Sequence, residues 1–251
     1  MNQIEHTISP EKDKLLKHVK VYNQLYVLIQ DGTYPIGTQL PSEPDLAAQM
    51  DVSRMTLRRA LALLQEDNLI QNVRGKGNFI KDHTHSTISS NTQLIQHPVA
   101  FCCKEPWDVV ELEFRIDPCS DFYAKALQCT PAAVVVADRW YKLSNSTPLI
   151  SYTLSFIPIE KITDYQVDLN DMTQLETYLQ NTVYCESTES TALFSHTTTG
   201  NFTSTKYLLS ETDSFMLIVE ALYDKKHTVM AYNKHYIPID SFQFTATANK
   251  R

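Results

Sequence analysis

The sequence contains little glycine and no long hydrophobic segment. Only 5 of its 251 residues are glycine, and no apolar run approaches the roughly 18–20 residues that span a membrane. Residues 1–10 carry neither the cationic start nor the apolar core of a secretion signal. We therefore expect a cytoplasmic protein that has no membrane partner.

Signatures of metal, cofactor and catalytic chemistry are also absent. The 5 cysteines form no Cys-x-x-Cys pair, and no histidine stands at zinc-finger spacing from them. The sequence has no glycine-rich phosphate loop, no Gly-x-Ser-x-Gly and no His-Glu-x-x-His motif. His83 and His85 lack a nearby cluster of carboxylates or cysteines. We expect reduced thiols, no metal site, no cofactor and no catalytic residue.

Charge is distributed unevenly along the chain. The net charge of −7 would by itself argue against a nucleic-acid partner. Residues 1–82, however, hold 10 basic and 10 acidic side chains, so the acidic excess lies beyond residue 82. Residues 52–81 hold 6 basic side chains against 2 acidic ones. This asymmetry predicts two domains with different tasks, at residues 1–81 and 97–251, joined by a polar linker at 82–96.

The first 81 residues carry the pattern of a winged helix-turn-helix. Apolar residues at helical spacing predict a helix at 14–30 that ends at Asp31-Gly32. Ser42 and Ser53 are suited to cap two further helices, at 43–50 and 54–66. Two short strands at 69–73 and 78–80 then flank a basic hairpin tip. This order of elements predicts a DNA-binding domain.

The third helix is expected to lie in the major groove of double-stranded DNA, with its N-terminal side chains and amides at base edges and phosphates. The glycines of the hairpin tip permit a close approach to the backbone or minor groove. The alternative is that the serines only cap helices, that the arginines are solvated, and that Arg59 pairs with an acidic residue of a neighbouring element. The candidate DNA-binding residues are Ser42, Glu43, Ser53, Arg54, Thr56, Arg58, Arg59, Arg74, Lys76 and Gly77.

Residues 22–80 resemble the DNA-binding domain of the GntR family of bacterial regulators. The matching stretches are 37–43 (Gly-Thr-Gln-Leu-Pro-Ser-Glu), 52–61 (Val-Ser-Arg-Met-Thr-Leu-Arg-Arg-Ala-Leu) and 75–80 (Gly-Lys-Gly-Asn-Phe-Ile). The resemblance implies a regulator that binds a pseudo-palindromic operator. Family members commonly carry arginine where Pro44 stands, so one expected DNA contact is missing here.

Residues 97–251 are dense in the residue types that favour strands. Because the strands do not alternate regularly with helices, we predict an antiparallel sheet and an α+β fold class. Strands are expected at 109–116, 133–142, 149–156, 183–194, 215–223, 228–236 and 242–246, and helices at 120–128, 173–182 and 203–209.

This second domain resembles the UTRA ligand-binding domain of the HutC-type subfamily, which is typified by the histidine-utilisation repressor. The resemblance is carried by the strand at 134–142, by Pro148 before the next strand, by 215–224 with Val219-Glu220, and by 236–244. It implies a fold like that of chorismate lyase. It also implies a homodimer that responds to a small-molecule effector.

Related UTRA domains often bind phosphorylated sugars through basic residues on the strand that matches 139–142, a carboxylate in the following strand, and residues of later strands. The usual carboxylate falls near Ser151 or Tyr152 and is absent here. Arg139 and Lys142 are three apart, so a regular strand points them to opposite faces, and which of them faces the pocket stays open. The alternative is that the aromatic residues pack in the core and the lysines lie at the surface. The candidate effector-binding residues are Arg139, Trp140, Lys142, Ser151, Tyr152, Glu220, Lys234 and Tyr236.

Together these features predict a transcriptional repressor that releases its operator when a small effector, such as a phosphorylated sugar or a phosphonate, binds the second domain. The sequence does not separate a repressor from an activator or a dual regulator. An enzyme that uses the lyase-like domain is a further alternative, for which the sequence shows no catalytic motif.

Overall fold

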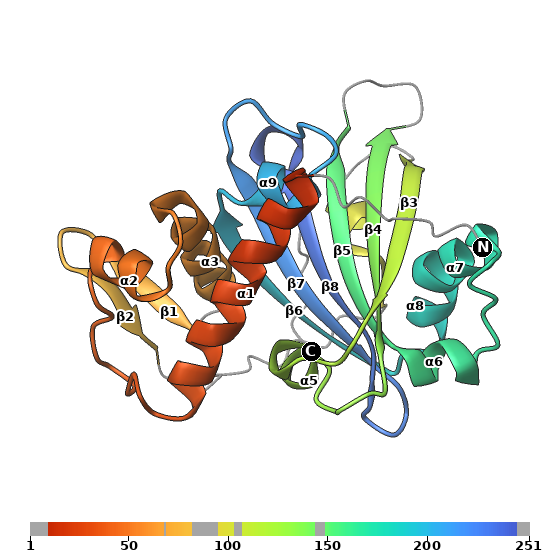
Figure 1. The fold of residues 1–251 in the computed structure, drawn as a ribbon. Helices are drawn as coiled ribbons and strands as arrows, with labels where there is room; N and C mark the ends of the chain where they lie inside the picture. Colours follow the sequence, from red (N-terminus) through yellow and green to blue (C-terminus); the bar gives the residue numbers. More distant parts are fainter. Residues whose placement is uncertain (1–9, 68, 82–94, 103–106, 144–148, 245–251) are drawn as a thin grey trace, which may run out of the picture. The chain divides into compact units, whose positions relative to one another are not determined.

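The computed structural model describes residues 10–67, 69–81, 95–102, 107–143 and 149–244 (Figure 1). The chain divides into two compact units, Met1–Ile88 and Ser89–Arg251. Of the linker predicted at 82–96, all but residues 95 and 96 lie outside the described residues. We describe each unit by itself.

The first unit has the predicted order of three helices and a hairpin (Figure 1). The helix predicted at 14–30 begins at Pro10, and the glycine after it, Gly32, has a φ of 79° that ends the helix. The elements are α1 (Pro10–Gln30), α2 (Glu43–Gln49), α3 (Arg54–Glu66), β1 (Ile70–Val73) and β2 (Gly77–Ile80).

Apolar side chains of the three helices form the core of the first unit. Leu25 of α1, Leu46 of α2 and Leu57 of α3 are completely buried. The Tyr22 hydroxyl donates a hydrogen bond of 2.7 Å to Asp67 and ties α1 to the end of α3. This packing holds the opposite side of α3 outward, where a partner can reach it.

The second unit is built on a six-stranded antiparallel sheet, as expected for an α+β domain. The strand order is β3-β4-β5-β8-β7-β6. The strands are β3 (Trp107–Asp117), β4 (Val134–Leu143), β5 (Ser151–Pro158), β6 (Glu189–Thr197), β7 (Phe215–Tyr223) and β8 (Val229–Pro238). The remaining elements are α4 (Pro98–Cys102), α5 (Asp121–Ala126), α6 (Ile159–Asp164), α7 (Met172–Thr177), a π-helical turn (Tyr178–Thr182), α8 (Val183–Glu186), α9 (Gly200–Ser204) and a short 3-10 helix, η2 (Ile239–Ser241).

Three of the predicted elements are wrong in the second unit. The strand predicted at 183–194 begins only at Glu189, because Leu175, Leu179 and Val183 follow helical spacing and are buried together. The helix predicted at 203–209 is instead α9, which ends at Thr205 with a φ of 54°. The strand predicted at 242–246 is not formed by the described residues 242–244, which follow the 3-10 helix.

The two faces of the sheet pack against different elements. Residues paired across an antiparallel ladder point to the same face, and successive residues alternate. On the first face, Val135 and Ala137 pack with side chains of α6, α7 and α8, which Figure 1 shows gathered at one side of the sheet. On the second face, Val134 and Val136 pack with Leu127, Phe122 and Tyr123 from in and around α5. The strands therefore distribute their polar residues between two separate environments.

Candidate DNA-binding surface and effector site

The N-terminus of α3 is open to solvent and held in shape by its cap. Ser53 has extended backbone angles, and its hydroxyl accepts a hydrogen bond of 3.1 Å from the Thr56 amide. It also lies 2.9 Å from the Thr56 hydroxyl. Ser53 and Arg54 are exposed, and Thr56 is partly buried. Polar groups and helix amides at an exposed N-terminus are suited to bind a phosphate.

An ion pair between α2 and α3 fixes the next basic side chain. The Nε of Arg58 lies 2.6 Å from a carboxylate oxygen of Glu43, and the Arg58 side chain remains 63% exposed. Ser42 caps α2 and donates to Asp45 over 2.5 Å. Because a carboxylate repels phosphate, Glu43 is not suited to contact DNA itself. Its ion pair suits it instead to orient Arg58. Arg59 is partly buried, and its side chain is not free of interactions.

The hairpin between β1 and β2 presents its basic residues at an exposed tip. Val73 pairs with Gly77, and Arg74, Gly75 and Lys76 form the turn between them. Gly75 and Gly77 have φ values of 76° and 99°, which residues other than glycine rarely adopt. The Gln39 side chain donates to the Lys76 carbonyl and anchors the tip to the rest of the unit.

The sheet register separates the residues predicted for the effector site into two groups. Arg139, Ser151 and Glu220 point to the first face, because Arg139 pairs with Thr153, Ser151 with Tyr141, and Glu220 with Asn233. The second face carries the other five, Trp140, Lys142, Tyr152, Lys234 and Tyr236. Arg139 and Lys142 thus lie on opposite faces.

A buried polar cluster occupies the first face around Arg139 and Glu220. We use this name for His97, Arg139, Tyr141, Thr153, Ser155, Gln180, Tyr184, Glu220, Asn233 and His235. Arg139 is completely buried, and it donates to the Ser155 hydroxyl over 2.7 Å and to the Leu179 carbonyl over 3.2 Å. Ser155 in turn donates to Asn233 over 2.6 Å. A buried guanidinium held in this way is a ready site for a small anion.

Glu220 is the acidic centre of the same cluster. One of its carboxylate oxygens accepts hydrogen bonds from the Tyr184 hydroxyl at 2.8 Å, from the Asn233 amide at 2.9 Å and from His235 Nε2 at 3.2 Å. The other ring nitrogen of His235 lies 2.9 Å from the Thr153 hydroxyl. Ser155 and Asn233 therefore connect Arg139 with Glu220 through hydrogen bonds.

His97 reaches into this cluster from the segment before α4. Its ring lies 5.0–5.6 Å from the rings of Trp107, Tyr141, Tyr184 and His235. The Tyr141 hydroxyl is 3.2 Å from Nε2 of His97, and the Val99 amide donates to Nδ1 over 3.3 Å. Burial holds the pKa of His97 well below its usual value, and the neighbouring His235 and Arg139 lower it further. His97 is therefore neutral at pH 7.

Some of the cluster residues that the sequence analysis did not single out lie on strands, where periodicity could have found them. Once Arg139 is placed inward, strand alternation puts Tyr141 on the same face. The pairing of β8 with β5 and β7 likewise places Asn233 and His235 beside Ser155 and Glu220. Tyr184 and His97 come from a helix and a loop end, and no periodicity in the sequence connects them with the strands.

The second-face residues form an aromatic cluster with a different character. The centre of the Tyr152 ring lies 5.5 Å from that of Trp140 and 5.7 Å from that of Tyr236. All three residues are buried. The Tyr152 hydroxyl donates to Asp138. Lys234 is also buried, and its ammonium lies 5.4 Å from the centre of the Phe122 ring. These contacts are those of a packed core.

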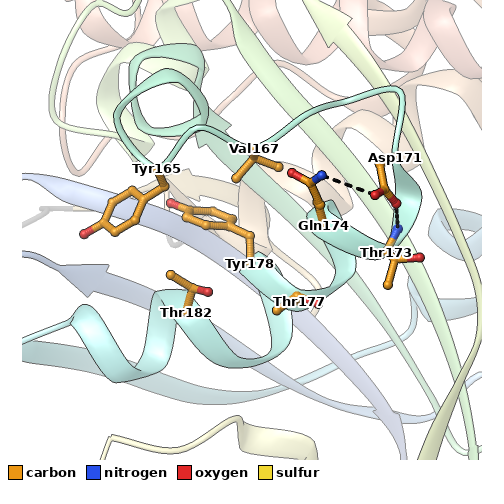
Figure 2. Close-up of a pocket in the computed structure, with 8 residues that line it drawn as sticks. All are labelled: Tyr165, Val167, Asp171, Thr173, Gln174, Thr177, Tyr178 and Thr182. Carbon is orange, nitrogen blue, oxygen red and sulfur yellow. Dashed lines mark hydrogen bonds between the residues drawn. The ribbon is translucent and has the colours of Figure 1, made fainter.

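An open hollow of about 230 Å³ is lined by residues of the segment 165–182, which Figure 2 draws as sticks. Tyr165, Val167 and Tyr178 form part of its wall. Its carboxylate, Asp171, caps α7 by accepting hydrogen bonds from the Thr173 amide at 3.0 Å and the Gln174 side chain at 3.2 Å, the two dashed contacts in Figure 2. The hollow offers a ligand no cationic side chain.

The described residues show neither a metal-binding cluster nor a membrane-spanning helix. They contain no group of three or more His, Cys, Asp or Glu side chains that could hold a metal ion. None of the helices in the described ranges is both long and apolar enough to cross a membrane.

The fold and exposed basic residues of the first unit define a DNA-binding domain of the winged helix-turn-helix class. Residues 17–80 match the family model of bacterial regulatory proteins, gntR family. The family model matches the first unit and does not extend to the second.

Several regulators are similar to part of the chain. GmuR of Bacillus subtilis (strain 168) is 36% identical over 151 residues, which cover 54% of this chain and 64% of GmuR. TreR of the same organism is 37% identical over 87 residues, or 35% of this chain and 33% of TreR. An operon regulatory protein of Escherichia coli (strain K12) is 31% identical over 115 residues, 45% of this chain and 43% of its own length. The matches therefore span less than two thirds of each relative.

Solved structures are similar over most of the chain. PhnF from Mycobacterium smegmatis aligns with a TM-score of 0.43 and 15% identity over 92% of this chain and 100% of PhnF. The effector binding domain of the trehalose repressor TreR of B. subtilis aligns with a TM-score of 0.42 and 10% identity, over 58% of this chain and 98% of that domain.

Proposed function

We propose that the protein is a cytoplasmic transcriptional repressor that binds a pseudo-palindromic operator as a homodimer and releases it when a small effector binds the second unit. The observation that carries this proposal is the exposed basic surface of α3 and the hairpin within a GntR-family domain. The acidity of the second unit should limit its own contact with DNA, so that binding is left to the first unit. The regulators of similar sequence support a regulatory rather than a catalytic role.

Removal of the basic side chains at the start of α3 tests the DNA-binding part. In the Arg54→Ala/Arg58→Ala variant, each lost contact is worth about 1 kcal/mol or more, so affinity should fall at least about thirtyfold. The matched control is Lys225→Ala/Lys226→Ala, which removes two exposed positive charges from the second unit. Affinities are measured by gel shift on DNA that the wild-type protein selects from a random pool. Equal affinity of the double-arginine variant and the control would contradict the proposal.

The proposed effector site is the buried polar cluster. Arg139 is placed to bind an anionic group of the effector, and Glu220 to accept hydrogen bonds from its hydroxyl or amino groups. A phosphorylated sugar or a phosphonate fits these two requirements. The second-face residues, Lys142 among them, are assigned to the fold and the surface rather than to the ligand.

A thermal-shift screen of sugar phosphates and phosphonates tests the effector site. The stabilisation by the best compound should disappear in Arg139→Met and in Glu220→Gln, because each removes one of the two charged partners. Lys142→Ala on the second face is the control and should keep the response. Loss of the response in Lys142→Ala alone would move the site to the second face.

The edge strand β6 is the surface that we propose for dimerisation with a second copy of the chain. β6 ends the sheet order, and its Leu193 and Phe194 are exposed. Its sequence has one acidic or basic residue other than histidine, Glu189, whereas the opposite edge strand β3 has five charged residues, which discourage pairing. Antiparallel pairing of two β6 strands around Leu193 brings no like charges together.

Leu193→Lys should yield a monomer in sedimentation velocity. Ile116→Lys on the opposite edge strand β3 is the control and should remain a dimer. An unchanged dimer in Leu193→Lys would refute this surface.

A further inference from the structure

The buried polar cluster is closed to solvent. Arg139, Tyr141 and His235 have no exposed surface, Glu220 is 2% exposed, and His97 is 5% exposed. A ligand that binds Arg139 or Glu220 must therefore displace a side chain that now fills the space.

Polar atoms of the cluster and beside it are left without a hydrogen-bond partner in the described structure. These atoms are Nε of Arg139, Oε1 of Gln180 and the hydroxyl of Ser151. All three are buried, and Ser151 and Gln180 flank Tyr141, the first as its ladder partner and the second through a hydrogen bond of 3.4 Å. An unsatisfied buried polar atom costs about 1–3 kcal/mol, which a ligand with matching groups would recover.

His97 is the member of the cluster that is held least firmly. The strand residues are fixed by ladder hydrogen bonds to two neighbouring strands, and Tyr184 is held within a helix. His97 precedes a helix of five residues and makes two hydrogen bonds, of 3.2 and 3.3 Å. Its remaining contacts are with four aromatic or imidazole rings, which could pack equally well against a ligand of the size of an imidazole. Displacement of His97 is therefore the least costly way to open the cluster.

The position of His97 in the sequence gives its displacement a consequence. The segment 95–102 is the first described part of the second unit, and only residues 82–94 separate it from the end of the DNA-binding unit at Lys81. Among the members of the cluster, His97 is the one nearest in sequence to the DNA-binding unit. The other residues of the cluster lie on strands or helices deeper in the second unit.

We propose that His97 is an internal plug that occupies the effector's place, and that the effector acts by expelling His97 together with the segment 95–102. This inference rests on the proposed function, and it adds how the site is regulated. The plugged form is the one that binds DNA, since it is the form without effector. An effector that binds only the unplugged form shifts the equilibrium by its difference in affinity for the two forms.

Removal of the His97 side chain tests the plug without a known effector. His97→Ala should behave like the effector-bound form, and its affinity for the DNA selected by the wild-type protein should fall about tenfold, within the usual range of coupling between sites. Imidazole added at millimolar concentration should fill the vacated place and restore the affinity of His97→Ala without changing that of the wild type. His227→Ala, in the exposed turn between β7 and β8, is the control and should bind DNA like the wild type.

The outcomes separate the plug from the proposed function. If the wild-type protein selects no DNA, the proposed function fails. If the wild type binds and His97→Ala binds equally well, with or without imidazole, the plug is refuted while the regulator remains. If His97→Ala loses cooperative thermal unfolding, His97→Gln is tested in its place. This variant keeps a polar side chain of similar length but loses the four ring contacts. Its affinity should fall several-fold, and wild-type affinity in His97→Gln would also refute the plug.

Discussion

Acid should destabilise the second unit through its two buried histidines, His97 and His235. Burial lowers the pKa of His97 and of His235, with a hydrogen bond from His235 to Glu220 opposing the shift at that residue. The charged or titratable groups that face the pair are Arg139 and Tyr141 on β4, Tyr184 on α8 and Glu220 on β7. Among these, the positive charge of Arg139 disfavours a second positive charge on either imidazole.

The sign and size of the effect follow from proton linkage. Histidine in an unfolded chain titrates near pH 6.5, and a folded-state pKa below that value means that the unfolded chain binds more protons. The free energy of unfolding is therefore fully retained above about pH 7 and falls as the pH drops below 6.5. A histidine that stays neutral in the folded protein costs at most about 1.4 kcal/mol for each pH unit below 6.5, so the pair costs at most about 2.8 kcal/mol by pH 5.5. His97 carries the larger share, because its pKa is lowered more than that of His235.

Urea unfolding at pH 7.5 and pH 5.5 measures this loss in the second unit alone. Both tryptophans of the sequence, Trp107 and Trp140, belong to that unit, so tryptophan fluorescence reports on its unfolding. In His97→Leu, the histidine with the larger pKa shift is gone, and the loss between the two pH values should be at most half that of the wild type. His227→Gln is the control: it removes an exposed histidine, and its loss between the two pH values should match that of the wild type. An equal loss in His97→Leu and wild type would refute the assignment of the acid effect to this cluster.

Three further predictions concern the first unit. Leu57→Ala removes a completely buried side chain of α3 and should cost about 2–5 kcal/mol in the unfolding of the first unit, seen by circular dichroism, while the tryptophan transition stays in place. Ser53→Ala removes the cap of α3 and should cost about 1 kcal/mol in the same experiment, and an unchanged stability would show that the cap is dispensable. Lys76→Ala at the exposed hairpin tip should reduce the slope of log affinity against log salt concentration by about 1 in gel shifts, whereas a parallel line at lower affinity would exclude a phosphate contact.

The sequence predicted the first unit almost completely, because its signals are local. The apolar spacing of α3, the capping position of Ser53 and the glycines of the hairpin each depend on neighbouring residues. The strands of the second unit that are dense in β-branched and aromatic residues, such as β7, were also predicted at their observed positions. One error arose where a β-branched residue occurs in a helix, at Val183, whose burial against Leu179 outweighs its preference for strands.

The candidate effector site was only partly predictable, because it depends on long-range register. Arg139 and Glu220 could be proposed from the resemblance, and strand periodicity showed that Arg139 and Lys142 diverge. The sequence alone could not show which face carries the helices α6–α8, so second-face residues such as Trp140 and Tyr236 were grouped with the others. His97 lies more than 40 residues from Tyr141 in sequence, and no local pattern relates the two.

The separation of the sheet into two faces has a consequence for how such a protein can diverge. Along β4 and β5, each residue that faces the buried polar cluster alternates with one that packs on the second face. Substitutions at alternate positions can therefore change the polar network of the first face while the neighbouring positions keep the hydrophobic packing of the second face intact. Under the proposed function, a change of inducer would need substitutions on the first face alone.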